Sequence, residues 1–136
     1  MKFFTREWFD LLQESGIEED PRVDEPPKTY LKLLQTQNIP TRILDRLDFH
    51  DSEVITFREA AETLTLELEE REWGYSHICF EKPEILKRDM GIEGCEWLYE
   101  EVYREGSGYE LHVLFYSRKE LGLKELILRC RDIRID

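Results

Sequence analysis

The residues best suited to chemistry lie where a helical segment gives way to a strand, at Phe49-His50-Asp51-Ser52-Glu53. His50 offers an imidazole that can take up or release a proton near neutral pH, and Asp51 places a carboxylate beside it in the sequence. Exposed polar side chains at such a junction serve either as caps or as site residues. A structural role stays open, because Asp51 or Ser52 can satisfy backbone amides in a turn while His50 packs beneath the helices.

A second candidate pair comes from a hairpin predicted between Trp97 and Phe115. The turn signal Arg104-Glu105-Gly106-Ser107-Gly108 fixes which residues face each other across the two strands. The predicted cross-strand pairs are Trp97 with Phe115, Leu98 with Leu114, Tyr99 with Val113, and Glu100 with His112. A carboxylate beside an imidazole can orient the ring for proton transfer, but the same two groups can also form only an ion pair on a solvated sheet face.

Aromatic residues alternate along the first strand of this hairpin. Because successive strand residues point to opposite faces, Trp97, Tyr99 and Tyr103 are expected to share one face. That face either packs beneath the helices or stays open as an aromatic recognition surface. The candidate binding residues are therefore His50, Asp51, Glu100, His112, Trp97 and Tyr99, and none is assigned a catalytic role.

Metal and cofactor chemistry find little support in the sequence. The side chains of His50, Asp51, His77 and His112 have suitable ligand types, but no two of the histidines lie at a spacing typical of metal ligands. The chain has no glycine-rich phosphate loop, no His-Glu-x-x-His helix, no Gly-x-Ser-x-Gly elbow and no paired Cys-x-x-Cys motif. The sequence thus predicts no metal and no cofactor, and it favours a non-enzymatic role without deciding the matter.

The elements that position these residues can be outlined from hydrophobic periodicity. A helix is expected from Thr5, its N-cap, to Ser15, followed by an acidic, proline-rich loop over 17–27. Two short amphipathic helices follow, over 29–36 and after Pro40. About six strands are expected, over 52–58, 63–69, 75–81 with an extension past Pro83, 97–103, 109–116 and 125–135.

These elements define an α+β fold. Residues 1–48 form the helical part and residues 49–136 form the sheet, and we expect the two parts to make a single domain. The connections between strands are too short for crossover helices, so the sheet is predicted to be a mostly antiparallel meander with the helices on one face. Such an open sheet has two edges, and a dimer that pairs edge strands is possible.

The overall charge narrows the choice of partners. The 136 residues include 31 acidic and 19 basic side chains, giving a formal net charge of −12. This charge repels nucleic acids and anionic lipids, and no apolar run approaches the roughly 20 residues that a membrane helix requires. We interpret the three widely spaced cysteines as reduced thiols and therefore expect a cytoplasmic protein. Its partner, if it has one, is expected to be another protein.

Several stretches resemble a bacterial family known as domain of unknown function 4085. They include Met1 to Trp8, Phe49 to Val54, Trp97 to Val102, Tyr109 to Phe115 and Leu126 to Ile133. The resemblance implies a bacterial cytoplasmic protein without an assigned activity, and it supplies no catalytic residues.

Three functional hypotheses follow from the sequence. The first is a non-catalytic, acidic protein-binding module, which accounts for the charge and for the missing enzyme motifs. The alternative is a small enzyme or ligand sensor with a site at the helix–sheet junction around His50 and Asp51. A purely structural, oligomeric subunit is a third possibility.

Overall fold

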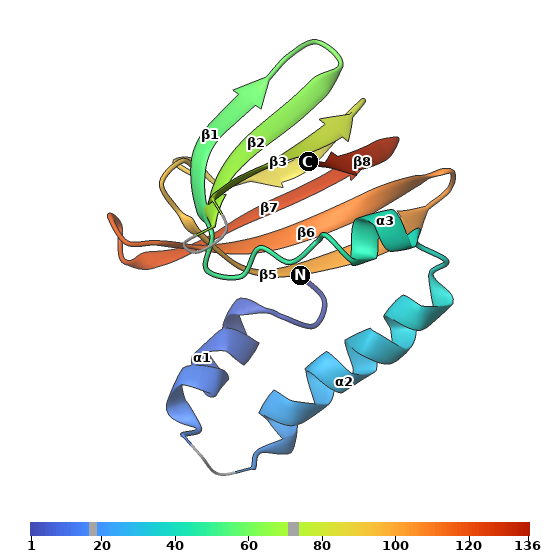
Figure 1. The fold of residues 1–136 in the computed structure, drawn as a ribbon. Coiled ribbons are helices and arrows are strands. Elements are labelled where there is room, and N and C mark those ends of the chain that lie inside the picture. The colour runs from blue at the N-terminus through green and yellow to red at the C-terminus, as the bar shows by residue number, and fades with distance from the viewer. Residues whose placement is uncertain (17–18, 71–73) are drawn as a thin grey trace.

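The computed structural model describes residues 1–16, 19–70 and 74–136. Within these ranges the chain forms three helices and one eight-stranded antiparallel sheet (Figure 1). The α+β class with a large antiparallel sheet is confirmed, but there are eight strands where about six were expected. The elements are α1 (Arg6–Glu14), α2 (Pro21–Thr36), α3 (Thr41–Leu44), β1 (Glu53–Glu59), β2 (Thr63–Glu70), β3 (Gly74–Glu81), β4 (Glu84–Arg88), β5 (Glu96–Glu105), β6 (Gly108–Ser117), β7 (Gly122–Cys130) and β8 (Asp132–Ile135).

The two extra strands arise because two predicted strands are each divided. Lys82 adopts a left-handed backbone (φ 48°) just before Pro83, so the chain turns out of β3 before β4 begins. The second predicted strand is divided at Arg131, which lies between β7 and β8. The strand order is β4-β7-β6-β5-β1-β2-β3-β8, so β1–β3 and β5–β7 form two meanders while β4 and β8 lie at opposite edges.

The sheet curls around one large apolar core. Leu64, Leu66 and Leu68 alternate along β2 with side chains that are fully buried, and they share this core with Leu126 and Leu128 of β7. Strands from the two ends of the order therefore face each other across the interior, as the ribbon shows (Figure 1). This burial is the main apolar stabilisation of the fold.

Helix α3 and the segments that flank it cover one side of the curled sheet. Ile39, Ile43 and Phe49 all belong to the main core. On the outside of the helix, Arg42 donates to the Asp132 carboxylate at 2.7 Å and to the Ile133 carbonyl at 2.8 Å. The helix is thereby fixed to β8.

Helix α1 begins and ends as expected from the sequence. Thr5 is its N-cap, and the Thr5 hydroxyl accepts a hydrogen bond from the Trp8 backbone N–H at 3.0 Å. Gly16 follows the helix with φ 61°, the left-handed conformation that glycine adopts without steric cost.

The predicted acidic loop over 17–27 is wrong in its second half, because α2 already begins at Pro21. Asp20 caps this helix and Pro21 occupies its first turn, where a missing N–H costs no intrahelical hydrogen bond. Residues 17 and 18 lie outside the described residues. Pro21, which argued against a helix, therefore helps to start one, and Pro26 and Pro27 are accommodated inside it.

A proline inside α2 creates the tie between the first two helices. Pro27 has no N–H to donate to the carbonyl of Val23, four residues earlier. That carbonyl instead accepts a hydrogen bond from Trp8 Nε1 at 2.9 Å, and the whole contact is buried. The Val23 carbonyl thus accepts a hydrogen bond from α1 in place of one within α2.

Helices α1 and α2 lie together on the outer face of β5 (Figure 1). A second, smaller apolar cluster joins Phe4, Trp8 and Tyr30 to Tyr103 of β5. Among the described residues, no helix has both the length and the apolar character needed to cross a membrane.

Candidate functional site

A β-bulge in β5 decides which candidate residues meet. Trp97 pairs with Phe115, as predicted, but the register then shifts by one residue between Trp97 and Tyr99. Beyond the bulge, Tyr99 faces Leu114, Glu100 faces Val113 and Glu101 faces His112. The predicted pairing of Glu100 with His112 is therefore wrong, as are the predicted pairs of Leu98 and Tyr99, because one extra residue on one strand offsets all later pairs.

The bulge also divides the predicted aromatic face. Trp97 points into the main core, is 0% exposed and packs edge-on against Phe49 and Phe115 at centroid distances of 5.2 and 5.6 Å. Tyr99 and Tyr103 instead belong to the smaller cluster under the helices. The expectation that all three rings share one face is thus wrong, since a bulge exchanges the faces of the residues that follow it.

Tyr99 lies at the centre of the candidate site. Its ring contacts Phe4, Trp8 and His50 at centroid distances of 5.4, 5.0 and 5.1 Å. Burial raises the pKa of Tyr99, and the negative charge of Asp51 raises it further. Tyr99 thus joins the helices on one side to the His50–Asp51 junction on the other.

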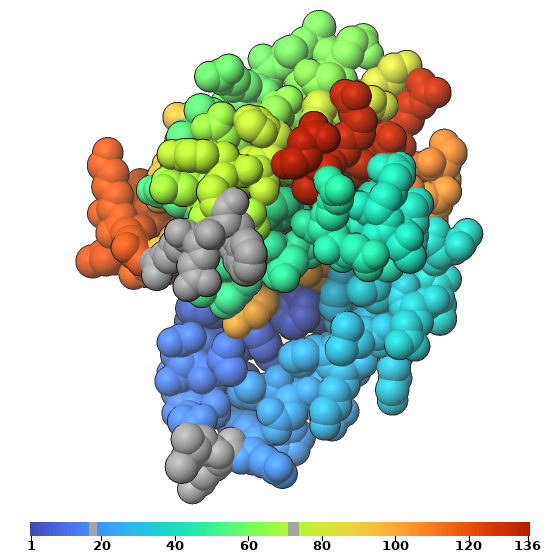
Figure 2. All heavy atoms as spheres, viewed as in Figure 1, coloured from blue at the N-terminus to red at the C-terminus, as the bar shows by residue number. Residues whose placement is uncertain are grey.

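A groove of about 550 Å³ opens between α1 and α2, with Tyr99 among its lining residues. Figure 2 shows the hollow between the two helices, beneath the sheet. Its remaining lining comprises the apolar side chains of Trp8, Leu12, Val23 and Pro27 and the charged side chains of Glu19, Asp24 and Lys28. An aromatic and aliphatic interior bordered mainly by carboxylates suits an apolar group that carries positive charge nearby.

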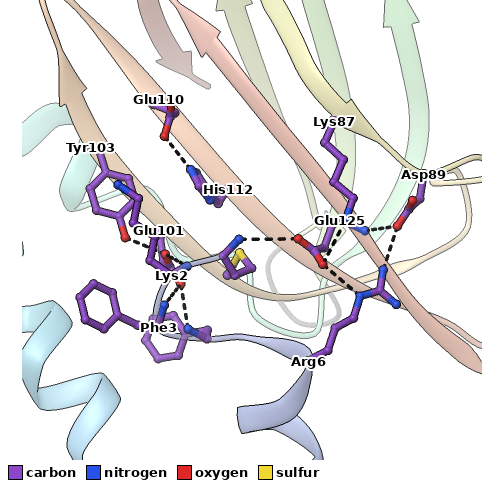
Figure 3. A network of polar contacts seen from close by, with 12 residues as sticks. Lys2, Phe3, Arg6, Lys87, Asp89, Glu101, Tyr103, Glu110, His112 and Glu125 are labelled. Atoms are coloured by element: carbon purple, nitrogen blue, oxygen red, sulfur yellow. Dashed lines mark hydrogen bonds and ion pairs between the residues drawn. The ribbon is translucent and has the colours of Figure 1, made fainter.

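A buried carboxylate holds the N-terminal arm, residues 1–5, against β5 (Figure 3). Glu101 is 0% exposed and accepts hydrogen bonds from the backbone N–H groups of Lys2, Phe3 and Phe4 at 2.8, 2.9 and 2.8 Å. The Tyr103 hydroxyl donates a fourth at 2.6 Å. Burial and the neighbouring Glu101 carboxylate raise the pKa of Tyr103 strongly, so the phenol stays a donor.

Ion pairs extend this anchor to the start of α1. Arg6 contacts Glu125 and Asp89 at 3.0 Å each, and the Met1 amino group lies 3.6 Å from Glu125 (Figure 3). Burial alone would raise the pKa of Glu125, but Arg6, the amino group and Lys87 outweigh burial and hold it below its usual range. The arm and α1 are thereby placed so that Trp8 reaches Tyr99.

His50 is oriented by the bulge. Its Nδ1 lies 2.5 Å from the Leu98 carbonyl, and because a carbonyl only accepts hydrogen bonds, we assign the ring proton to Nδ1. The other ring nitrogen, Nε2, lies 3.6 Å from Asp51 Oδ1, so the two side chains form an ion pair when the ring is protonated. Asp51 adopts a left-handed backbone (φ 67°), and the side chains of both residues are about half exposed, at 48% and 58%. The structure thus brings His50 and Asp51 together beside Tyr99.

Glu100 lies beside the same junction with a half-buried side chain. Burial raises its pKa to about 7; the negative charge of Asp48 contributes, while the Glu100 backbone N–H, His50 and Trp97 favour the ionised form. The Trp97 Nε1–H influences Glu100 without completing a hydrogen bond, since that buried atom lacks a partner within the described residues. Glu100 is therefore a carboxyl group poised between its two protonation states at neutral pH.

His112 stands apart from this group. Its Nε2 lies 2.7 Å from Glu110, whose other oxygen accepts from Arg129 at 2.9 Å, and its ring lies 5.4 Å from that of Tyr103 (Figure 3). The composite site in which His50, Asp51, Glu100 and His112 converge is not formed, because His50 contacts Tyr99 and His112 contacts Tyr103, four residues further along β5. His112 instead belongs to a network of polar contacts with Glu110 and Arg129.

Acidic side chains continue from Asp51 across the neighbouring strands. Glu53 of β1 pairs with Glu69 of β2 on one side and with Glu96 of β5 on the other. With Asp51 and Arg118 these residues line a hollow of about 250 Å³, and Arg118 forms an ion pair with Glu96. Like charges directly opposite one another in a sheet are destabilising. The carboxylates of this row also add to the negative electrostatic potential next to the groove.

Sequence reasoning missed the walls of the groove. Val23, Asp24 and Pro27 fell in a segment assigned to a loop, although the Asp20-Pro21 pair was a readable helix start. Sequence reasoning also missed Glu101. This residue follows Glu100 in the sequence but lies on the opposite face of β5, and the bulge decides which face each of them takes. Within residues 1–16, 19–70 and 74–136, no three His, Cys, Asp or Glu side chains are grouped in a way that could hold a metal ion.

Comparison with known proteins returned no match to a family model, to a curated protein or to a solved structure.

Proposed function

We propose that this chain is a non-catalytic protein-binding module that holds a basic segment of a partner protein, with one apolar side chain of that segment in the groove between α1 and α2. The observation that carries the proposal is the groove itself, with Tyr99 and Trp8 inside it and Glu19 and Asp24 at its border. Its volume falls in the range of about 300–1,000 Å³ that is usual for ligand sites.

Charge supports a basic partner. The chain carries a formal net charge of −12, and the carboxylates of the groove are followed, past Tyr99, by Asp51 and the row formed by Glu53, Glu69 and Glu96. Lysine or arginine side chains that flank the apolar anchor would relieve the repulsion within this row. Cys79, Cys95 and Cys130 are free thiols, which agrees with a reducing compartment such as the cytoplasm.

Synthetic peptides test this proposal directly. Each peptide carries one central leucine, phenylalanine or tryptophan, flanked by lysines in one series and by glutamates in the other, and binding is measured by isothermal titration calorimetry. We expect the lysine series to bind and the glutamate series not to bind. Raising the salt concentration from about 0.05 to about 0.5 M should weaken binding roughly tenfold, because it screens the charges.

A pair of matched variants locates the binding site. Asp24→Asn removes one charge from the groove, whereas Asp10→Asn removes the same charge from an exposed position on α1 that does not line it. We expect the first variant to weaken binding of the lysine peptides about fivefold and the second to change it little. Equal losses in both variants, or equal binding of both peptide series, would contradict the proposal.

A further inference from the structure

The turn between β6 and β7, residues 118–121, presents a leucine to solvent. Ser117 pairs with Gly122 at the base of this turn, and Leu121 within it is 77% exposed. Leu121 also adopts a left-handed backbone (φ 53°), in which a residue with a side chain is more strained than glycine. An exposed leucine in a strained conformation adds little to the stability of its own chain and points to contact with another molecule. We call residues 118–121 the tip.

Basic side chains lie around Leu121 in the sequence. Arg118 and Lys119 precede it in the tip, and Lys124 follows it. Glu120 is the one acid of the tip. Arg118 and Lys124 form ion pairs with carboxylates of their own chain, whereas Lys119 is exposed. Although the whole chain carries a net charge of −12, this end of the sheet thus presents a positive charge beside an apolar side chain.

The groove between α1 and α2 complements the tip in apolar character and in charge. Its volume of about 550 Å³ and its aromatic walls, Trp8 and Tyr99, can receive one apolar side chain. Two carboxylates and one ammonium group border the groove, whereas the tip carries two bases and one carboxylate. The border residues are Glu19, Asp24 and Lys28, and the tip residues are Arg118, Lys119 and Glu120. Each charge at the border therefore has a charge of opposite sign available in the tip.

We propose that the partner held in the groove is a second copy of this chain, which inserts Leu121 of its tip between α1 and α2. This inference rests on the proposed function, because it names the partner of the same groove. The tip projects from the side of the molecule, at the left in Figure 2, whereas the groove opens between the two helices beneath the sheet. Each molecule can therefore offer its tip to one neighbour and its groove to another, so the copies associate head to tail.

The expected association is weak and reversible. One inserted side chain makes a small interface, and copies that each carry a net charge of −12 repel one another at long range. Burial of the leucine supplies the apolar attraction, while Lys119 opposite the carboxylates of the groove orients the tip. Sedimentation velocity of the full chain should therefore show a weight-average mass that rises with concentration across the micromolar range and passes that of a dimer.

A matched pair of leucine variants tests the anchor. Leu121→Ala removes the inserted side chain, and we expect it to weaken association about tenfold, as the loss of a buried leucine implies. Leu31→Ala makes the same change at a leucine of α2 that is 57% exposed and lies outside the groove lining. This control variant should associate like the wild type. Both positions are exposed, so neither substitution is expected to disturb the fold.

A mixing experiment tests whether the tip of one copy meets the groove of another. Asp24→Lys reverses a charge at the groove, whereas Leu121→Ala disables the tip, and each variant alone should be largely monomeric. An equimolar mixture should form dimers, because the intact tip of the first variant fits the intact groove of the second. Longer assemblies should be absent from the mixture, since the remaining tip and the remaining groove are both defective.

Two results would overturn the proposal: a wild type that stays monomeric across the micromolar range, or association that Leu121→Ala leaves unchanged. A mixture of the two variants that stays monomeric would overturn it as well. The lysine peptides separate this inference from the proposed function. If they bind while the wild type stays monomeric, the groove has a different partner and only the self-association fails. If they do not bind, the proposed function fails whatever the sedimentation shows.

Discussion

Two adjacent glutamates in β5 show how strongly position decides chemical character. Glu101 lies beneath the N-terminal arm, where three backbone N–H groups and one phenol donate to its carboxylate. Glu100 lies on the opposite face, where burial dominates and few donors compensate. A fully satisfied buried carboxylate fastens two parts of a fold together, whereas a poorly satisfied one becomes sensitive to protonation.

The anchoring role of Glu101 predicts a large loss of stability on substitution. In Glu101→Gln, the amide nitrogen would face N–H donors, and at least one buried hydrogen bond would be lost. We expect the free energy of unfolding in urea to fall by about 3 kcal/mol, the upper part of the range for a buried charged network. Tyr103→Phe, which removes only the phenol donor, should cost about 1 kcal/mol. A cost for Glu101→Gln no larger than that of Tyr103→Phe would contradict the anchor.

At the scale of elements, an irregularity in one strand and prolines in one helix build the site. The bulge at Leu98 turns Tyr99 towards the helices and presents the carbonyl that orients His50. Pro27 frees the Val23 carbonyl for Trp8, which brings α1 and α2 together as the walls of the groove. Both features depart from regular secondary structure, and both lie where the candidate site forms.

A double-mutant cycle tests whether the hydrogen bond from Trp8 to the Val23 carbonyl replaces the helix bond that Pro27 cannot form. Trp8→Phe leaves the Val23 carbonyl buried without a partner, so we expect a cost of about 2 kcal/mol in the free energy of unfolding. In a Pro27→Ala background, the new N–H at position 27 can bond that carbonyl, and the same Trp8→Phe change should cost about 1 kcal/mol less. Loss of ring volume is common to both backgrounds and cancels. A coupling energy of zero would show that the two residues act independently.

Sequence patterns captured the regular elements and failed where tertiary contacts decide. The Thr5 cap, the strand over 63–69 and the pairing of Trp97 with Phe115 follow from local rules and are confirmed. The bulge one residue later has no local signature, so every pairing beyond it was misplaced. The start of α2 was missed because prolines were weighed as helix breakers, although in a first turn they are well tolerated.

At the scale of the whole molecule, carboxylates paired with bases join the helices to the sheet. Arg6 joins α1 to Glu125 of β7, Arg42 joins α3 to Asp132 of β8, and Arg129 and His112 hold Glu110. Burial alone would raise the pKa of Glu110 and of Asp132, but their hydrogen bonds to basic partners outweigh burial and lower it. Each of these groups stabilises the fold above its ordinary pKa and loses that contribution as pH falls through its lowered value.

Because some carboxyl groups have raised and others lowered pKa values, we expect the free energy of unfolding to be greatest at about pH 5. Above it, Glu100 becomes costly as pH rises towards about 7, and below it Glu110, Glu125 and Asp132 become protonated. In urea denaturation from pH 3 to pH 8, the free energy of unfolding should fall by about 2–3 kcal/mol above the maximum and should also fall below it.

Variants assign the two sides of that maximum. Glu100→Gln should flatten the decline above pH 5, and Arg6→Gln should reduce the decline below it. Arg22→Gln, which breaks a surface ion pair with Asp20, serves as the matched control and should leave the profile nearly unchanged. A profile that rises steadily from pH 3 to pH 8 would contradict the assignment of Glu100.

The short passage from β7 to β8 also constrains the folding pathway. Arg131 alone separates two strands that stand near opposite ends of the strand order, so β8 can dock on β3 only after both meanders have formed and curled towards each other. Closure therefore depends on contacts between residues far apart along the chain, which are slow to form because of the entropy of loop closure. Until β8 docks, β3 has an open edge that can pair with other chains, so slow closure is the stage at which this protein is most exposed to aggregation.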